Sequence, residues 1–186
     1  MFFLPFHFIM APNRQKTGFA EGYSMTAAQI MEKMIVFSNG NIHDIDHFIR
    51  VWTYAKTIGE SELLDKDTQF ILEVAAITHD IACPLCREKY GNTDARHQEE
   101  ECAELAKAFL SDTGITEAQA ERVAWLVGHH HTLTGIDGTD WQILIEADYI
   151  ANATEKHYDE SDIRNFIRES MKTESGKRLA REVFCI

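Results

Sequence analysis

A run of nine almost entirely apolar residues, Phe70 to Thr78, is the feature that most constrains how this chain can fold. Its length and content predict a helix that is buried on most sides. The run ends directly at His79 and Asp80. Burying an imidazole and a carboxylate without partners costs free energy, and a metal ion is one of the few partners that satisfies both. The chain is therefore expected to fold around a central helix that presents a polar pair at its C-terminal turn.

Helical spacing of apolar residues recurs along the rest of the chain. Thr26–Gln29 and Thr116–Gln119 have the form of capping boxes, and apolar residues at helical spacing follow each of them. Helices are expected over about 26–37, 42–58, 67–80, 97–110, 116–130 and 140–153, with Asp67 and Asp140 as N-caps, and beyond residue 161 with a break at Ser175–Gly176. Residues 83–94 are expected to form an ordered loop. Because no alternating β-branched run occurs, the sequence predicts an all-α, single-domain bundle of about six to eight helices.

The charge balance limits the classes of partner. A formal net charge of −12 over 186 residues argues against binding to nucleic acid polymers or anionic membranes, because both need a basic face. The same charge repels a phosphorylated substrate at long range, so a phosphate site would need a local cation. Four cysteines without a convincing secretory signal indicate free thiols in a reducing cytoplasm.

The N-terminal segment differs from the rest of the chain. Its first ten residues are mostly apolar, but they are too few to span a bilayer and lack the basic region of a signal peptide. Residues 1–24 are expected to form a disordered or swapped arm. The folded domain is expected to occupy residues 25–186.

Two more ionisable residues interrupt apolar helical patterns. His47 lies upstream of the central run, and Asp148 lies downstream of it. His79 and Asp80 point about 100° apart on a helix, but at the last turn both can reach one ion beyond the helix end. The Asp80 carboxylate could also bridge to a second ion. Two histidines and two aspartates suit Mn, Fe, Co, Zn or Ni, and suit Mg less well.

The order of these residues resembles a known family. His47 followed by Arg50, then His79–Asp80, then Asp148 is similar to the HD-domain superfamily of metal-dependent phosphohydrolases. The resemblance covers about residues 42–154. It implies an all-α bundle, metal ligation by His47, His79, Asp80 and Asp148, catalytic roles for Asp80 and His79, and hydrolysis of phosphate esters, often of nucleotides.

The resemblance also raises the question of a second ion. Branches of the superfamily with two metals use extra histidines between the His-Asp pair and the last aspartate. His97 and the pair His129–His130 lie in that interval, so all three are candidate ligands. His97 fits the His-x-x-x-Gly-Ala motif of those branches only in part, because Cys102 replaces a small residue of that motif. Thr132 follows His131, where the cyclic-dinucleotide branch has Gly-Tyr-Pro, so membership of that branch is not expected.

Other residues are candidates for contact with the substrate. Arg50, one turn after His47, could bind a phosphate or make a structural ion pair, and Lys89 and Arg87 follow the His-Asp pair. His131 is a further candidate for the substrate pocket. Cys83 and Cys86 have neither the second cysteine pair of a zinc site nor the βαβ context of a redox motif, so free thiols are the simpler interpretation.

The sequence thus predicts a cytoplasmic metal-dependent phosphohydrolase that uses one or two divalent ions on a small phosphorylated substrate, with a nucleotide favoured. A di-iron dinucleoside polyphosphate hydrolase would use the same residues. A non-catalytic HD module that senses a nucleotide or a metal remains an alternative from another class. The sequence leaves a homodimer open.

Overall fold

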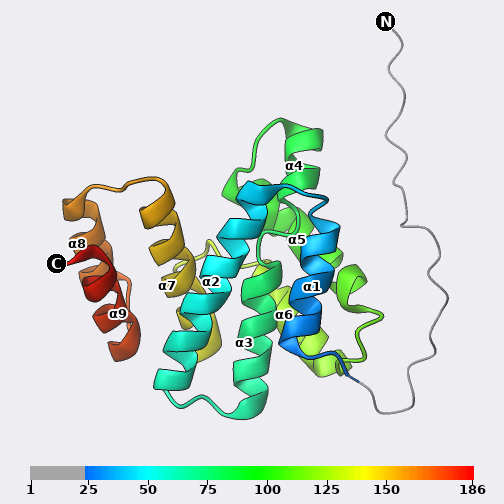
Figure 1. Ribbon diagram of the computed structural model, residues 1–186, viewed down its shortest axis with the longest axis horizontal. Coiled ribbons are helices and arrows are strands. Elements are labelled where there is room, and N and C mark those ends of the chain that lie inside the picture. The colour runs from blue at the N-terminus through cyan, green and yellow to red at the C-terminus, as the bar shows by residue number, and fades with distance from the viewer. Residues whose placement is uncertain (1–23) are drawn as a thin grey trace, which may run out of the picture.

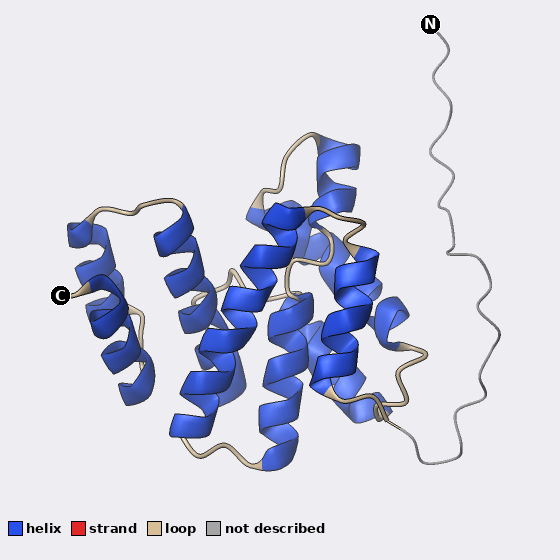
Figure 2. Ribbon diagram, in the orientation of Figure 1, coloured by secondary structure: helices blue, strands red, loops and turns tan. Residues whose placement is uncertain are grey.

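The computed structural model describes residues 24–186, which fold entirely into helices joined by short connections (Figures 1 and 2). The nine helices of this part of the chain are α1 (Ala27–Phe37), α2 (Ile42–Ser61), α3 (Lys66–Thr78), α4 (Cys83–Tyr90), α5 (Ala95–Leu110), α6 (Glu117–Val127), α7 (Thr139–Glu155), α8 (Glu160–Glu169) and α9 (Glu174–Phe184). The prediction of an all-α fold is confirmed. The arm expected over residues 1–24 lies outside the described residues, apart from Ser24.

Helix α3 is the centre of the bundle, as the apolar run predicts. Every residue from Ile71 to Thr78 is buried, because α2, α7, α6 and α1 all pack against α3 (Figure 1). The segment Lys66–Tyr90 is long and apolar enough to cross a membrane, but most of its apolar window is buried within the bundle, which is the pattern of a core helix. Helices α8 and α9 lie at one side of the bundle, where α9 packs against α7 and α2 and α8 packs against α9.

Two N-caps differ from those predicted. The N-cap of α3 lies two residues earlier than expected, because the carboxylate of Asp65 accepts the backbone N–H groups of Asp67 and Thr68. Gly138 precedes the first turn of α7, and Asp140 lies inside that turn. The Asp140 carboxylate is instead bound by the guanidinium of Arg122.

The expectation of a loop over residues 83–94 is wrong for its first eight residues, which form α4. Pro84 favours this helix, because a proline in the first turn needs no backbone N–H and presets a helical φ. The helix ends at Gly91, whose φ of +72° is a left-handed conformation that glycine adopts without strain. Helix α4 packs mainly on α5 and projects from the end of the bundle (Figure 1).

The expected break at Ser175–Gly176 is also wrong, because both residues lie in the first turn of α9. A buried carboxylate explains the glycine. Glu146 on α7 accepts hydrogen bonds from the backbone N–H groups of Lys172 and Thr173 and from the Thr173 hydroxyl. A Cβ atom on Gly176 would lie 2.0 Å from Glu146 Oε2. The glycine therefore permits close approach of α9 to α7 and does not interrupt the helix.

A candidate metal centre

Three helices bring the four predicted ligands together. His47 lies in the second turn of α2, His79 caps the C-terminus of α3 and Asp80 follows it, and Asp148 lies midway along α7. His47 Nε2 is 3.1 Å from His79 Nε2, 3.2 Å from Asp148 Oδ1 and 3.5 Å from Asp80 Oδ2. His79 Nε2 is 3.5 Å from Asp148 Oδ1 and 3.7 Å from Asp80 Oδ2. These residues form what we call the first donor group.

The first donor group fits a divalent cation. The Nδ1 atom of His79 lies 2.9 Å from the Ala76 carbonyl oxygen, and that of His47 lies 3.0 Å from Glu155 Oε2. A proton on each Nδ1 leaves both Nε2 lone pairs directed at one point, which two carboxylates also face. The C-terminus of α3 adds partial negative charge at the same place. This His/Asp cluster can therefore hold a divalent metal.

A second donor group shares Asp80 with the first. One donor atom each from Asp80, His130 and His131 lies within 4.8 Å of the others. Asp80 Oδ1 faces His130 Nε2 at 3.5 Å, while Asp80 Oδ2 faces the first group. The Nε2 atoms of His130 and His131 are buried and have no hydrogen-bond partner in the described structure. Such orphaned nitrogens are costly unless something absent from the chain binds them.

The structure places two other candidate ligands elsewhere. The His129 ring stacks on Trp125 with centroids 4.4 Å apart, and its Nδ1 lies 2.7 Å from the Trp125 carbonyl oxygen. The His97 ring stacks on Tyr90 at 3.9 Å, and its Nδ1 lies 3.0 Å from Asn92 Oδ1. The structure brings neither histidine into a donor group. Of the histidine pair expected to contribute, only His130 does so, together with the following residue.

Burial and close carboxylates set the charges of the first donor group. Burial alone would lower the pKa of His47, but Asp148, Asp80 and Glu155 outweigh it and raise that pKa to about 9. Burial alone would raise the pKa of Asp148, but the imidazoles of His47 and His79 hold it well below its usual range. Without a metal, the His47 imidazole is therefore protonated on both nitrogens and positively charged at neutral pH.

The second donor group contains an imidazole with the opposite shift. Burial and the adjacent His130 lower the pKa of His131 to about 4. Burial would lower the pKa of His130 as well, but the Asp80 carboxylate reverses the sign. His131 is therefore neutral at pH 7, and its free Nε2 can accept a proton or bind a cation.

We expect metal binding to release at least about one proton per chain at pH 7, because a ligating His47 must lose the proton that its raised pKa retains. The affinity should then rise roughly tenfold per pH unit between pH 6 and 8 and level off near the His47 pKa. Titration calorimetry with Mn²⁺ in buffers of different ionisation enthalpy measures the released protons. A binding heat that is independent of the buffer would contradict the prediction.

A cavity of about 220 Å³ opens onto the metal centre. Its walls are polar, and among the described residues no Phe, Tyr or Trp lines it. The lining residues are His43, Asp44, His47, Asp80, Cys83, Arg87, Thr93, Ala95, Gln98, His131, Asp148, Asn152, Glu155 and Lys156. His131 is thus in the cavity, as expected for a residue that contacts substrate.

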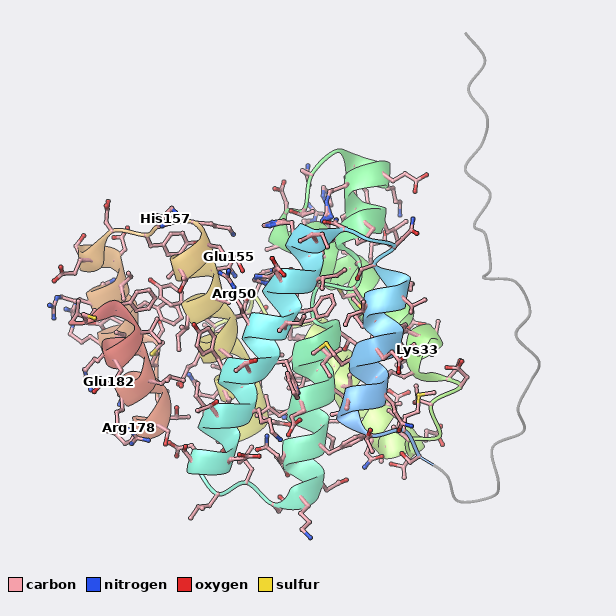
Figure 3. All side chains as sticks on the ribbon, in the orientation of Figure 1. Lys33, Arg50, Glu155, His157, Arg178 and Glu182 are labelled. Atoms are coloured by element: carbon pink, nitrogen blue, oxygen red, sulfur yellow. The ribbon has the colours of Figure 1, made fainter. Side chains whose placement is uncertain are left out.

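The predicted phosphate-binding residues Arg50 and Lys89 do not line this cavity. Arg50 Nη1 lies 3.7 Å from Glu155 Oε1, and the two side chains face each other between α2 and α7 (Figure 3). Lys89 binds Glu101. The Lys and Arg side chains that line the cavity are Arg87, whose Nη1 and Nη2 both bind the Asp44 carboxylate, and Lys156, which follows α7.

The sequence reasoning missed Glu155 and Lys156. One signal was available for Glu155, which lies seven residues after Asp148 and therefore on the same face of the helix. No motif marks Lys156. Its proximity to the metal centre depends on where α7 ends relative to α2.

The expected free thiols are present in the structure. All four cysteines are free, and Cys83, Cys86 and Cys102 are buried. Burial and the nearby Asp80 carboxylate raise the pKa of Cys83, so its thiol stays protonated and unreactive. The Cys102 thiol donates a hydrogen bond to the His79 carbonyl oxygen at 3.2 Å and so supports the turn that holds the metal-binding pair.

Comparisons with known proteins identify the family and the fold. The model of the HD domain family matches residues 44–183. A crystal structure described as a predicted HD superfamily hydrolase, from an uncultured Thermotogales bacterium, is 23% identical; the alignment covers 85% of this chain and 84% of that chain with a TM-score of 0.61. Bacillus subtilis YpgQ in complex with ADP is 22% identical, with 84% and 86% covered and a TM-score of 0.55. No curated protein matches the chain significantly.

Proposed function

The chain belongs to the HD domain family, and from that premise we propose that it is a metal-dependent phosphohydrolase acting on a small phosphorylated metabolite. The carrying observation is the position of Asp80. Its two oxygens face different donor groups, and the same carboxylate lines the cavity. The Asp80 carboxylate is shared between the first donor group and the two unpaired imidazole nitrogens of the second. This arrangement suits one ion or two beside a cavity for the substrate.

The residues divide the chemistry between them. A bound divalent cation would supply Lewis acidity toward a phosphoryl oxygen and lower the pKa of an adjacent water. His47, His79 and Asp148 would hold that cation. Asp80 would hold it too and orient the attacking water, because its Oδ1 and Oδ2 face opposite sides of the site. The neutral His131 lies in the cavity wall with an unpaired Nε2, and in the tautomer that carries its proton there it would donate a hydrogen bond to a phosphoryl oxygen.

The cavity favours the phosphate portion of the substrate. The cavity volume of about 220 Å³ is smaller than that of pockets that enclose a whole ligand. Among the described residues that line it, none has an aromatic ring of Phe, Tyr or Trp on which a nucleobase could stack. In a nucleotide, the phosphates would therefore occupy the cavity and the base would lie outside it. The ADP complex of YpgQ supports a nucleotide-like ligand. The same cavity gives no platform for the two bases of a dinucleoside polyphosphate, so that alternative is not favoured.

Purified protein loaded with Mn²⁺, Co²⁺ or Fe²⁺ tests the proposal. Phosphate or pyrophosphate release should be assayed against nucleoside mono-, di- and triphosphates and against simple phosphomonoesters. We expect turnover that disappears after treatment with a chelator and returns with the metal. Metal bound at the site without turnover of any of these substrates would contradict the proposal and would indicate a non-catalytic module.

We expect Lys156→Ala to raise KM roughly tenfold and to change kcat little, because a charge-assisted contact to a phosphate outside the reacting centre would be lost. Among the described residues, Lys156 is the cavity-lining Lys or Arg that no carboxylate binds. Lys66→Ala, an exposed lysine at the start of α3, is the matched control. Equal KM values for the two variants in a steady-state assay would remove Lys156 from the substrate site.

A further inference from the structure

The side of the His47 ring that faces away from the metal centre has a definite partner. Glu155 Oε2 lies 3.0 Å from His47 Nδ1, and the Glu155 side chain is only 14% exposed. The other carboxylate oxygen, Oε1, lies 3.7 Å from Arg50 Nη1. Arg50 and Glu155 face each other between α2 and α7 (Figure 3), and Glu155 in turn contacts the candidate ligand His47 on α2.

We propose that Glu155 is a positioning residue that fixes the orientation and tautomer of His47 for metal binding, and that Arg50 in turn holds Glu155. The inference rests on the proposed metal site and deepens it, because it assigns a role to two residues that are not ligands. It also replaces the interpretation of Arg50 as a phosphate-binding residue.

Helix geometry supports this assignment. Arg50 follows His47 by three residues, so both side chains lie on one face of α2. Glu155 follows Asp148 by seven residues, so the ligand and the positioning carboxylate lie on one face of α7. Docking of α2 on α7 therefore sets the Asp148–His47 contact and the Glu155–His47 contact at the same time.

The two imidazoles of the first donor group are held in different ways. The acceptor for His79 Nδ1 is the backbone carbonyl of Ala76, which no side-chain substitution removes. The acceptor for His47 Nδ1 is a carboxylate. A carboxylate beside Nδ1 holds the ring proton there. The Nε2 lone pair is then available to the metal, and Nε2 becomes a stronger ligand. Without Glu155, the His47 ring can rotate or take the other tautomer.

Metal affinity is the appropriate measurement, because it does not depend on turnover. We would titrate Co²⁺ against a competing chelator and record the visible spectrum of bound Co²⁺ for the wild type and four variants. Glu155→Ala should weaken binding roughly 10–100-fold, the usual loss for a removed outer partner. Glu155→Gln should weaken it less, because an amide oxygen still accepts the Nδ1 proton. Arg50→Ala should weaken it a fewfold, and Glu160→Ala, which removes an exposed carboxylate bound to Arg164, should match the wild type.

The wavelengths of the Co²⁺ bands should be unchanged in the Glu155 variants, because the set of ligands is unchanged. A different coordination number in Glu155→Ala would make Glu155 a ligand and overturn the proposal. Equal affinities for Glu155→Ala and Glu160→Ala would also overturn it. For Arg50, a raised KM with unaltered Co²⁺ affinity would assign the guanidinium to substrate and refute its positioning role.

These outcomes separate the inference from the proposed function. If the variants lose Co²⁺ affinity as expected but the wild type releases no phosphate, the positioning role stands and the hydrolase proposal fails. If the wild type hydrolyses substrate and Glu155→Ala keeps full affinity, the reverse holds. Metal-free thermal melts of all variants check that the affinities are compared between folded proteins.

Discussion

Replacing Asp80 with asparagine is expected to lower kcat/KM by roughly 10³-fold or more, because the cation that we propose Asp80 helps to hold would contribute several kcal/mol to the proposed reaction. Asparagine keeps the shape of the side chain and removes its charge. It offers one neutral oxygen where the carboxylate presents Oδ2 to His47 and His79 and Oδ1 to His130. An amide N–H₂ group would then face imidazole nitrogens on one side.

Steady-state phosphate release and metal content per chain should be measured together for Asp80→Asn. The matched control is Asp162→Asn on the exposed first turn of α8, which should behave as the wild type. A fall in activity at full metal content would point to a role in orienting water, and a parallel fall in both would point to ligation. Activity within a fewfold of the wild type would contradict the placement of Asp80 at the reacting centre.

Replacing Gly176 with alanine is expected to lower the free energy of unfolding by about 3 kcal/mol, which sums the strain of overpacking and the loss of hydrogen bonds to a buried carboxylate. The added Cβ would lie 2.0 Å from Glu146 Oε2 and 2.5 Å from Thr173 Oγ1. Glu146 cannot move away freely, because it is fully buried and also accepts a hydrogen bond from the Gln142 side chain at 2.8 Å.

Urea unfolding of the metal-free protein measures this effect without interference from metal binding. Glu174→Ala is the control, since it changes an exposed residue of the same helical turn whose partner is Lys177. The control should differ from the wild type by less than about 0.5 kcal/mol. If Gly176→Ala unfolds at the same urea concentration as the control, the close approach of α9 to Glu146 does not limit that position.

The parts of the fold that local patterns determine could be predicted from the sequence. The apolar run from Phe70 identifies α3, because a helix surrounded by four others needs apolar residues on every side. Helix α4 was missed because a proline such as Pro84 fits both a loop and the first turn of a helix. The choice between them depends on Gly91 and on packing against α5, which periodicity does not reveal.

The candidate site divides in the same way. Ionisable residues within apolar helices are visible in a sequence, and the structure brings His47, His79, Asp80 and Asp148 together. Choosing among consecutive histidines was not feasible, because they follow the end of α6 at Val127 and a turn has no fixed angular period. Ion pairs between distant residues were also invisible: Glu155 pairs with Arg50 and Glu101 with Lys89, which removes both cations from the substrate cavity.

The distribution of the candidate ligands along the chain also means that a bound cation would stabilise the native state alone. His47 and His79 are 32 residues apart, and Asp148 follows His47 by 101. An unfolded chain cannot hold such groups together, so mass action stabilises the folded protein by RT ln(1 + [M]/Kd), where [M] is the free cation concentration. At one hundred times Kd this gain is about 2.7 kcal/mol. On the proposed function, the melting temperature should therefore follow the free concentration of the cation, and a cell that depletes this metal would lose both the proposed activity and part of the folded population.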